Sequence, residues 1–189
     1  MAIKSYLEKM RANKIVQFVS FETPLDNDAF MVQWEQLNKS LNNDMDVTLQ
    51  QTVKNGSFRY IAQHRYASNE LEFAFTKLKK PSRVPEVPIR IKQAGGYSML
   101  QIERTDDAKE NESKLFVFVT DPTADLNAYK ELPGANKLNI YEAYYENCQY
   151  AYILEIFVPS KQAATMLEQL KQINTDEAAI YNACILQAA

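Results

Sequence analysis

Hydrophobic and polar residues follow a recurrent order along this chain, and one short stretch is written twice. Residues 15–24 (IVQFVSFETP) form an apolar run that ends in polar residues and proline, and residues 115–122 (LFVFVTDP) repeat it. Each copy is followed by a helical pattern, two strand patterns, a second helical pattern and a last strand pattern. Because chance similarity does not preserve the order of six elements, the pattern predicts two βαββαβ units in tandem.

The clearest strand pair belongs to the first unit. Its first strand alternates between apolar and polar residues, as a half-buried strand does, and residues 55–56 (Asn-Gly) favour a type I′ turn. With a two-residue turn, Val47 lies opposite His64 and Gln51 lies opposite Tyr60. One face of this hairpin is then apolar apart from the histidine, glutamine and tyrosine side chains, and the other face is largely polar.

The polar stretch at residues 104–113 (RTDDAKENES) divides the chain, because its apolar content is limited to one alanine. We interpret it as a solvated linker. The predicted units are residues 1–103, which include an N-terminal helix, and residues 114–189, in which the helices are shorter. Ser68 and Ser160 are predicted to cap the second helix of each unit.

Composition excludes several classes of function. The chain has 189 residues, 46% of them hydrophobic, and a net charge of −3, which gives no general reason to bind nucleic acid or an anionic membrane. No apolar run approaches the roughly 20 residues that span a bilayer, and the N-terminus lacks the apolar core of a signal peptide. The two cysteines, Cys148 and Cys184, have no metal-ligand spacing. We therefore expect a cytoplasmic protein.

The stretch at residues 58–75 (FRYIAQHRYASNELEFAF) resembles the third strand and second helix of the antibiotic biosynthesis monooxygenase-like family. Residues 15–34 resemble that family's first strand, its proline-containing turn and a helix with a Trp-Glu pair, here Trp34-Glu35. The resemblance implies an α+β fold in which the antiparallel sheets of two ferredoxin-like units pack as a dimeric α+β barrel, formed here within one chain. It also implies a cofactor-independent monooxygenase that acts on a small aromatic or polyketide-like compound, and it allows a homodimer.

His64 is the only histidine of the chain, and it is predicted to point to the apolar face between the sheet and the helices. It is interpreted either as a general base that deprotonates a phenol-like substrate or as a structural histidine held by a carbonyl or hydroxyl group. Tyr66 is the second candidate catalytic residue. Relatives usually have tryptophan at this position, so the family's catalytic role does not transfer directly.

Aromatic side chains are the candidates for substrate binding. Trp34, Tyr60 and Tyr97, together with Tyr66, could line a pocket for a planar ligand, and Gln51 adds a polar group on the same hairpin face. Alternatively, Trp34 is the largest core residue of its helix, and the tyrosines are present because they suit strands.

No cofactor is expected. One histidine and two distant cysteines supply too few ligands for a transition-metal site. The family resemblance places a haem-contacting histidine on a helix, and neither predicted helix of the first unit has one, although a tyrosine ligand would remain.

Two functions fit the sequence. One is the metal-free and haem-free monooxygenase, with His64 and nearby tyrosines. The other is a non-catalytic module of the same fold that binds a small apolar ligand or assembles with itself. When Ser68 is aligned with Ser160, Ile156 replaces His64 and Val158 replaces Tyr66, so the first unit is predicted to contain the single candidate site.

Overall fold

The computed structural model describes residues 14–40, 46–52, 59–65, 92–105, 111–135, 137–143, 149–174 and 180–185. The strands of these ranges are β1 (Lys14–Glu22), β2 (Asp46–Thr52), β3 (Tyr60–Arg65), β4 (Lys92–Glu103), β5 (Glu112–Val119), β6 (Lys137–Ala143), β7 (Tyr152–Pro159) and β8 (Ile180–Ile185). The helices are α2 (Asn27–Ser40), α4 (Leu126–Lys130) and α5 (Ala163–Ile173), with a 3₁₀ turn, η2 (Ser160–Gln162), before α5. None of these helices is long and apolar enough to cross a membrane. The predicted N-terminal helix and the helix predicted after Ser68 lie outside the described residues.

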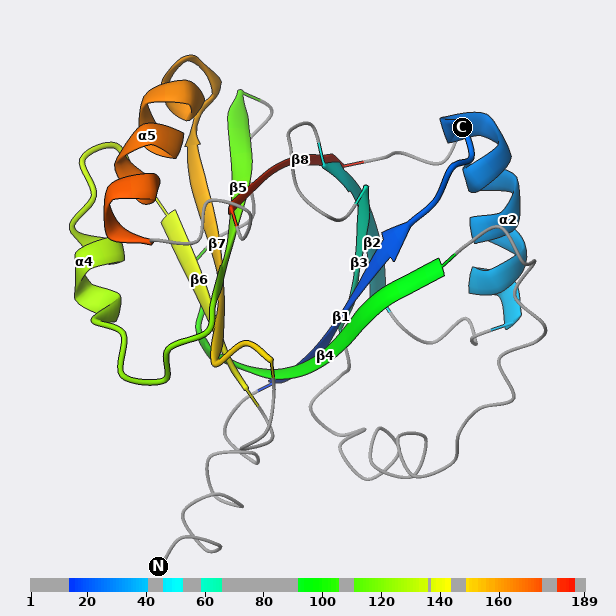
Figure 1. Ribbon diagram of the computed structural model, residues 1–189, viewed down its shortest axis with the longest axis horizontal. Coiled ribbons are helices and arrows are strands. Elements are labelled where there is room, and N and C mark those ends of the chain that lie inside the picture. Colours follow the sequence, from blue (N-terminus) through cyan, green and yellow to red (C-terminus); the bar gives the residue numbers. More distant parts are fainter. Residues whose placement is uncertain are drawn as a thin grey trace, which may run out of the picture.

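The strands form one closed barrel in the order β1-β3-β2-β8-β5-β7-β6-β4, and β4 pairs back to β1. All of the strand pairs are antiparallel. Helix α2 lies outside the barrel on one side, and helices α4 and α5 lie outside it on the opposite side (Figure 1). The predicted α+β class and antiparallel barrel are confirmed, and a single chain closes the barrel.

Each half of the chain contributes four neighbouring strands, and their order is the same in both halves. The first half has the order β4-β1-β3-β2 and the second half has the order β8-β5-β7-β6. In each group the first strand lies between the last strand and the third. Two seams join the groups, one between β2 and β8 and the other between β4 and β6.

The register predicted for the first hairpin is confirmed. Val47 pairs with His64 and Gln51 pairs with Tyr60, as a two-residue turn requires. The turn itself, at residues 55–56, lies outside the described residues. Because side chains alternate along a strand, this register decides which of them face the helices.

Strand β4 is irregular close to its two glycines, Gly95 and Gly96. Ser20 of β1 pairs with Gly95, whereas the next residue, Phe21, pairs with Gln93. One residue of β4 therefore has no partner on β1, which is the arrangement of a β-bulge. The bulge changes the register of the β1–β4 pair at this end.

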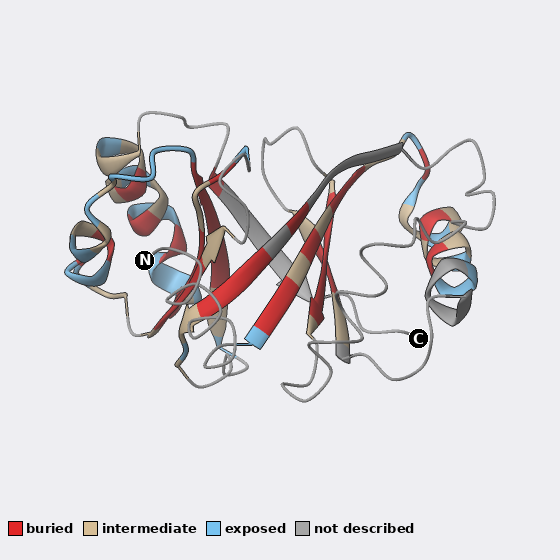
Figure 2. Cartoon of the chain, turned by 90° about the horizontal axis from the view of Figure 1, so that it is seen from below, coloured by how far each residue is buried: buried red, intermediate tan, exposed pale blue. Residues whose placement is uncertain are grey.

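Buried side chains lie in three clusters, one inside the barrel and one on each helix-facing side. The interior cluster comes from both halves and consists of Val16, Phe18, Ile61, Tyr97, Met99, Phe116, Phe118, Tyr141, Tyr150 and Ile153. The strands are largely buried, whereas the helices are buried on the side that faces them (Figure 2). A strand of this barrel thus has covered residues on both faces.

This enclosure corrects one expectation from the sequence. A half-buried strand has one face in solvent, but Gln50 and Gln63 on the polar face of the first hairpin have exposures of 0%. The reason is that the closed barrel surrounds this face, so its polar side chains lie inside the molecule. They bond to one another and to polar groups of the second half.

Two boundaries also differ from the prediction. Ser160 does not cap α5: Gln162 is the N-cap residue, without a side-chain capping bond, and Ser160 begins η2. The Ser160 hydroxyl instead donates to the carbonyl of Asn111 at 3.1 Å, which ties the end of β7 to the start of β5. Strand β5 begins at Glu112, so the predicted linker at residues 104–113 overlaps its first two residues.

Candidate functional site

Helix α2 covers the helix-facing side of the first half. Asp26 caps this helix, because its side chain accepts a hydrogen bond from the backbone N–H of Ala29 at 2.8 Å. Phe30 and Trp34 are four residues apart, so they lie on the same side of the helix. Both are buried against the sheet with Tyr60 and other residues of β2 and β3.

We define the first-half site as Asn27, Trp34, Gln51, Tyr60 and His64. The rings of this site pack in a row together with Phe30, a neighbour on α2. The Tyr60 ring stacks on the Phe30 ring with centroids 3.8 Å apart and 5° between the planes. Phe30 is also stacked with Trp34 at 6.4 Å, and the Trp34 ring meets the His64 ring edge to face at 6.3 Å. The structure therefore brings the predicted residues Trp34, Tyr60 and His64 together.

Asn27 is the member of this site that the sequence analysis missed. Its Oδ1 accepts hydrogen bonds from the Tyr60 hydroxyl at 2.5 Å and from Gln51 Nε2 at 3.1 Å. Its Nδ2 donates to Gln51 Oε1 at 3.4 Å. The only sequence signal at Asn27 is its position at a helix start, which is typical of a capping residue. The Tyr60 proton is used in the bond to Asn27, so the Tyr60 hydroxyl does not donate to His64.

His64 is buried, with 4% of its surface exposed. Burial lowers the pKa of the imidazole from 6.5 to about 4, because the charged form loses hydration. His64 is consequently neutral at pH 7. In this form one ring nitrogen can accept a hydrogen bond or a proton.

Tyr97 lies apart from the first-half site, on the opposite face of the sheet. It pairs with Phe18 and belongs to the interior cluster, where its ring contacts Phe118 at 6.0 Å and Tyr150 at 5.1 Å. Residue type alone groups Tyr97 with Trp34, because the register of β4, which separates the two side chains, is not evident from the sequence. Tyr66 lies outside the described residues.

A haem group does not fit between Trp34 and His64 of the first-half site. The edge-to-face contact between Trp34 and His64 leaves no space for a porphyrin between these rings, which are 6.3 Å apart. No step through haem therefore follows from these residues. No group of three His, Cys, Asp or Glu side chains within the described residues could hold a metal ion.

The helix-facing side of the second half has a different composition. Ile156, aligned with His64 in the sequence, has an exposure of 0% and packs among aliphatic residues beneath α4 and α5. Val158 lies in the same cluster, with Met166 and Leu170 of α5. Tyr129 is the single aromatic residue of the buried cluster. The structure therefore agrees with the predicted asymmetry between the halves.

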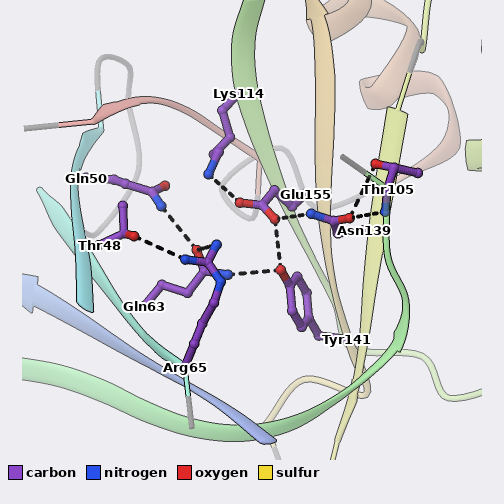
Figure 3. Close-up of polar contacts among 9 residues, drawn as sticks. All are labelled: Thr48, Gln50, Gln63, Arg65, Thr105, Lys114, Asn139, Tyr141 and Glu155. Carbon is purple, nitrogen blue, oxygen red and sulfur yellow. Dashed lines mark hydrogen bonds and ion pairs between the residues drawn. The ribbon is translucent and has the colours of Figure 1, made fainter. Parts of the chain in front are cut away.

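Inside the barrel, the structure reveals a polar network that the sequence analysis did not identify. Glu155 of β7 is completely buried, and Lys114 of β5 forms an ion pair with its Oε1 at 2.5 Å. Asn139 donates to Glu155 Oε2 at 2.6 Å and the Tyr141 hydroxyl donates to the same oxygen at 2.8 Å. Figure 3 shows these side chains converging on the carboxylate.

The electrostatic balance of Glu155 favours its charged form. Burial acts to raise the pKa of this carboxyl, but the Lys114 charge and the hydrogen bonds from Asn139, Lys114 and Tyr141 outweigh it and hold the pKa below its ordinary value. Burial, together with the negative charge of Glu155, raises the pKa of Tyr141 well above 10. The interior thus contains an ionised pair and a protonated tyrosine at neutral pH.

The network also crosses the barrel from one half to the other. Gln63 of β3 donates through Nε2 to the Tyr141 hydroxyl at 2.9 Å. Gln63 Oε1 accepts from Arg65 at 3.1 Å and from Gln50 at 3.3 Å. We define the interior network as the nine residues of Figure 3: Thr48, Gln50, Gln63, Arg65, Thr105, Lys114, Asn139, Tyr141 and Glu155.

The closed antiparallel barrel and its outer helices define the class of fold as an α+β barrel. A solved mutant of chlorite dismutase from Candidatus Nitrospira defluvii, in complex with cyanide, matches with a TM-score of 0.54 and 8% identity over 99% of this chain and 96% of that one. An anthrone oxidase-like protein matches with a TM-score of 0.54 and 11% identity over 92% of each chain. No protein-family model matches the sequence, and no curated protein matches it. At these identities the likeness shows the fold alone.

Proposed function

We propose that this protein is a cofactor-independent monooxygenase for a small aromatic compound, which binds at the first-half site. The supporting observation is the asymmetry between the two helix-facing sides. The second half fills its side with aliphatic residues, whereas the first half buries a histidine and a tryptophan beside a half-buried, hydrogen-bonded amide pair. Polar groups in a core cost stability, and such departures from simple packing are concentrated at functional sites.

The reaction class is the oxidation of an activated ring carbon by dioxygen. A CH₂ group becomes C=O with one oxygen atom of O₂, and the other oxygen leaves as water, so the electrons balance without an added reductant. His64 is the proposed proton acceptor, since burial keeps it neutral. Trp34 and Tyr60 are the proposed aromatic contacts. Asn27 accepts the hydrogen bond of the Tyr60 hydroxyl, and Gln51 in turn bonds to Asn27. Tyr66 stays a candidate from the sequence, and Tyr97 would act only from the barrel interior.

One observation favours a second function, the binding of a small aromatic molecule without catalysis. His64 has an exposure of 4%, and a pKa of about 4 makes it a weak base at neutral pH. Efficient general bases have pKa values close to the working pH. In this alternative His64 accepts a hydrogen bond from the ligand and no bond is broken.

Two substitutions of His64 separate these functions. His64→Gln keeps a hydrogen-bonding side chain but cannot take up a proton, whereas His64→Leu keeps apolar volume alone. The test measures oxygen consumption and ligand binding with anthrone as the probe compound. A monooxygenase loses turnover in both variants and keeps binding in His64→Gln. A binding module shows no turnover even in the wild type, and only His64→Leu loses binding. Wild type without turnover or binding contradicts both functions.

We further propose that residues 15–103 and 115–187 are tandem ferredoxin-like units related to the antibiotic biosynthesis monooxygenase-like family. The shared strand order of the two halves supports this proposal. Superposition of the two ranges strand for strand in a crystal structure would strengthen it, and different helix positions relative to the strands would contradict it. A cytoplasmic location and a homodimer belong to the same proposal. The dimer is tested by the molar mass in solution.

A further inference from the structure

Gln50 of β2 has a buried acceptor that lacks a protein donor. Its exposure is 0% and its Nε2 donates to Gln63 at 3.3 Å. Its Oε1 has no hydrogen-bond partner among the described residues. Buried polar atoms in native proteins nearly always have a partner, and an exception indicates water or a ligand.

The hydrogen-bond network fixes the orientation of this amide. Arg65 can only donate, so the atom of Gln63 that faces it at 3.1 Å is Oε1. The same Oε1 accepts from Gln50, which must therefore present its Nε2 to Gln63. The Gln50 oxygen is left on the other side of the amide, where Gln63 cannot satisfy it.

Lys114 supplies donors in the same part of the barrel. Its ammonium group has three N–H donors, and its carboxylate contact is Glu155 at 2.5 Å. It also lies against the rings of Phe116 and Phe157, at 5.8 and 5.3 Å from their centroids. In Figure 3, Gln50 and Lys114 extend into the barrel from β2 and β5, the strands on either side of β8.

We propose that the interior network is a second binding site, for a small neutral molecule that has a hydroxyl group next to an oxygen acceptor. The hydroxyl donates to Gln50 Oε1, and the acceptor receives a hydrogen bond from Lys114. A neutral ligand is favoured because Glu155 already compensates the lysine charge, and an anion would be repelled by this carboxylate. This site lies on the opposite face of the sheet from the first-half site and is independent of the proposed function.

The neighbouring aromatic rings limit the size of the ligand. Phe18 packs edge to face on Tyr141 at 4.9 Å and on Phe116 at 6.1 Å, which fills the interior beside the network. A further ring would have to displace these contacts. We therefore restrict the proposed ligand to a small molecule such as a two-carbon diol.

Ethylene glycol is the probe for the test, and acetonitrile, which accepts but does not donate hydrogen bonds, is the matched control compound. Each is titrated into the full-length protein while the side-chain amide signals of Gln63 are followed by NMR. We expect a saturable shift with ethylene glycol and none with acetonitrile. Gln50→Leu should weaken ethylene glycol binding at least tenfold, whereas Gln101→Leu, a buried glutamine outside the network, should leave it unchanged.

Three results would overturn the proposal: no saturable shift with ethylene glycol, equal shifts with both compounds, or equal affinity in wild type and Gln50→Leu. A crystal soaked in ethylene glycol that shows only a bridging water at Gln50 would overturn it as well. The Gln50→Leu variant must first show the same NMR dispersion as the wild type. If it does not fold, Gln50→Met takes its place with the same expected loss.

Discussion

The two helix-facing sides of this barrel occupy corresponding places but are built differently. Beneath α2 lie stacked aromatic rings, a buried histidine and the amides of Asn27 and Gln51. Beneath α4 and α5 lie aliphatic side chains, with Ile156 where sequence alignment places His64. An apolar layer gains stability from burial alone, whereas a layer with buried polar groups must also satisfy their hydrogen bonds. In the function proposed above, the layer beneath α2 therefore contains the chemistry, and the layer beneath α4 and α5 contributes apolar packing.

The largest effect is expected in the aliphatic layer. Leu170 of α5 has an exposure of 0%, so Leu170→Ala should lower the free energy of unfolding by about 2–5 kcal/mol. Urea unfolding measures the loss. Ligand binding at the first-half site should stay unchanged under conditions where the variant is folded. Impaired binding would show that the two layers do not act separately.

His64, a residue of the first half, should make the stability of the protein depend on pH. Its pKa is about 4 in the folded protein and 6.5 when unperturbed, so between these values the unfolded chain binds more protons. The stabilisation is complete above pH 6.5 and is lost as the pH falls to 4, by about 3 kcal/mol. The measurement is the difference in unfolding free energy between wild type and His64→Leu from pH 7 to pH 4. A difference that does not change with pH would argue against a buried neutral histidine.

A smaller loss of stability is expected when the histidine of the first-half layer is introduced at the corresponding position of the aliphatic layer. Ile156→His places an imidazole among aliphatic side chains, where an unsatisfied polar group should cost about 1–3 kcal/mol. Thermal or urea unfolding gives the cost, and Ile156→Val is the control for lost volume. If the histidine were tolerated as well as valine, the aliphatic layer would be as permissive as the first-half site.

The smallest loss of stability is expected from removing the hydrogen bond that the Tyr60 hydroxyl donates to Asn27. Tyr60→Phe removes this bond and leaves the stack on Phe30, so the free energy of unfolding should fall by about 1 kcal/mol. Tyr129→Phe in the second half is the matched tyrosine control. Equal losses in the two variants would show that the Asn27 bond adds nothing specific to the first layer.

Short-range pattern was sufficient to predict much of the fold. The Asn-Gly pair and the alternation around it predicted that Val47 pairs with His64, because a two-residue turn fixes the register. The same register put His64 on the side of α2. The order of elements predicted the antiparallel barrel, although only through the family resemblance.

The local sequence pattern could not predict that the barrel closes. The alternation of apolar and polar residues is the same whether polar residues such as Gln50 and Gln63 face solvent or an enclosed interior. It shows which residues share a face of the strand but not what that face contacts. A usable signal was present at Glu155, a lone charge within the apolar run ILEIFV, and at Lys114 just before LFVFV. Charges at such positions are rarely buried without a partner, so the two together could have predicted the ion pair.

The two seams of the barrel have a consequence for how the chain can be divided. Two strand pairs connect the halves: β2 pairs with β8, and β4 pairs with β6. A chain cut within residues 106–110 would give two fragments, each with two open sheet edges. An open sheet edge has unpaired backbone N–H and C=O groups, so it can pair with a strand of another molecule. Each fragment produced alone should therefore aggregate or pair with a copy of itself, and mixing the two should restore solubility by giving every edge its partner.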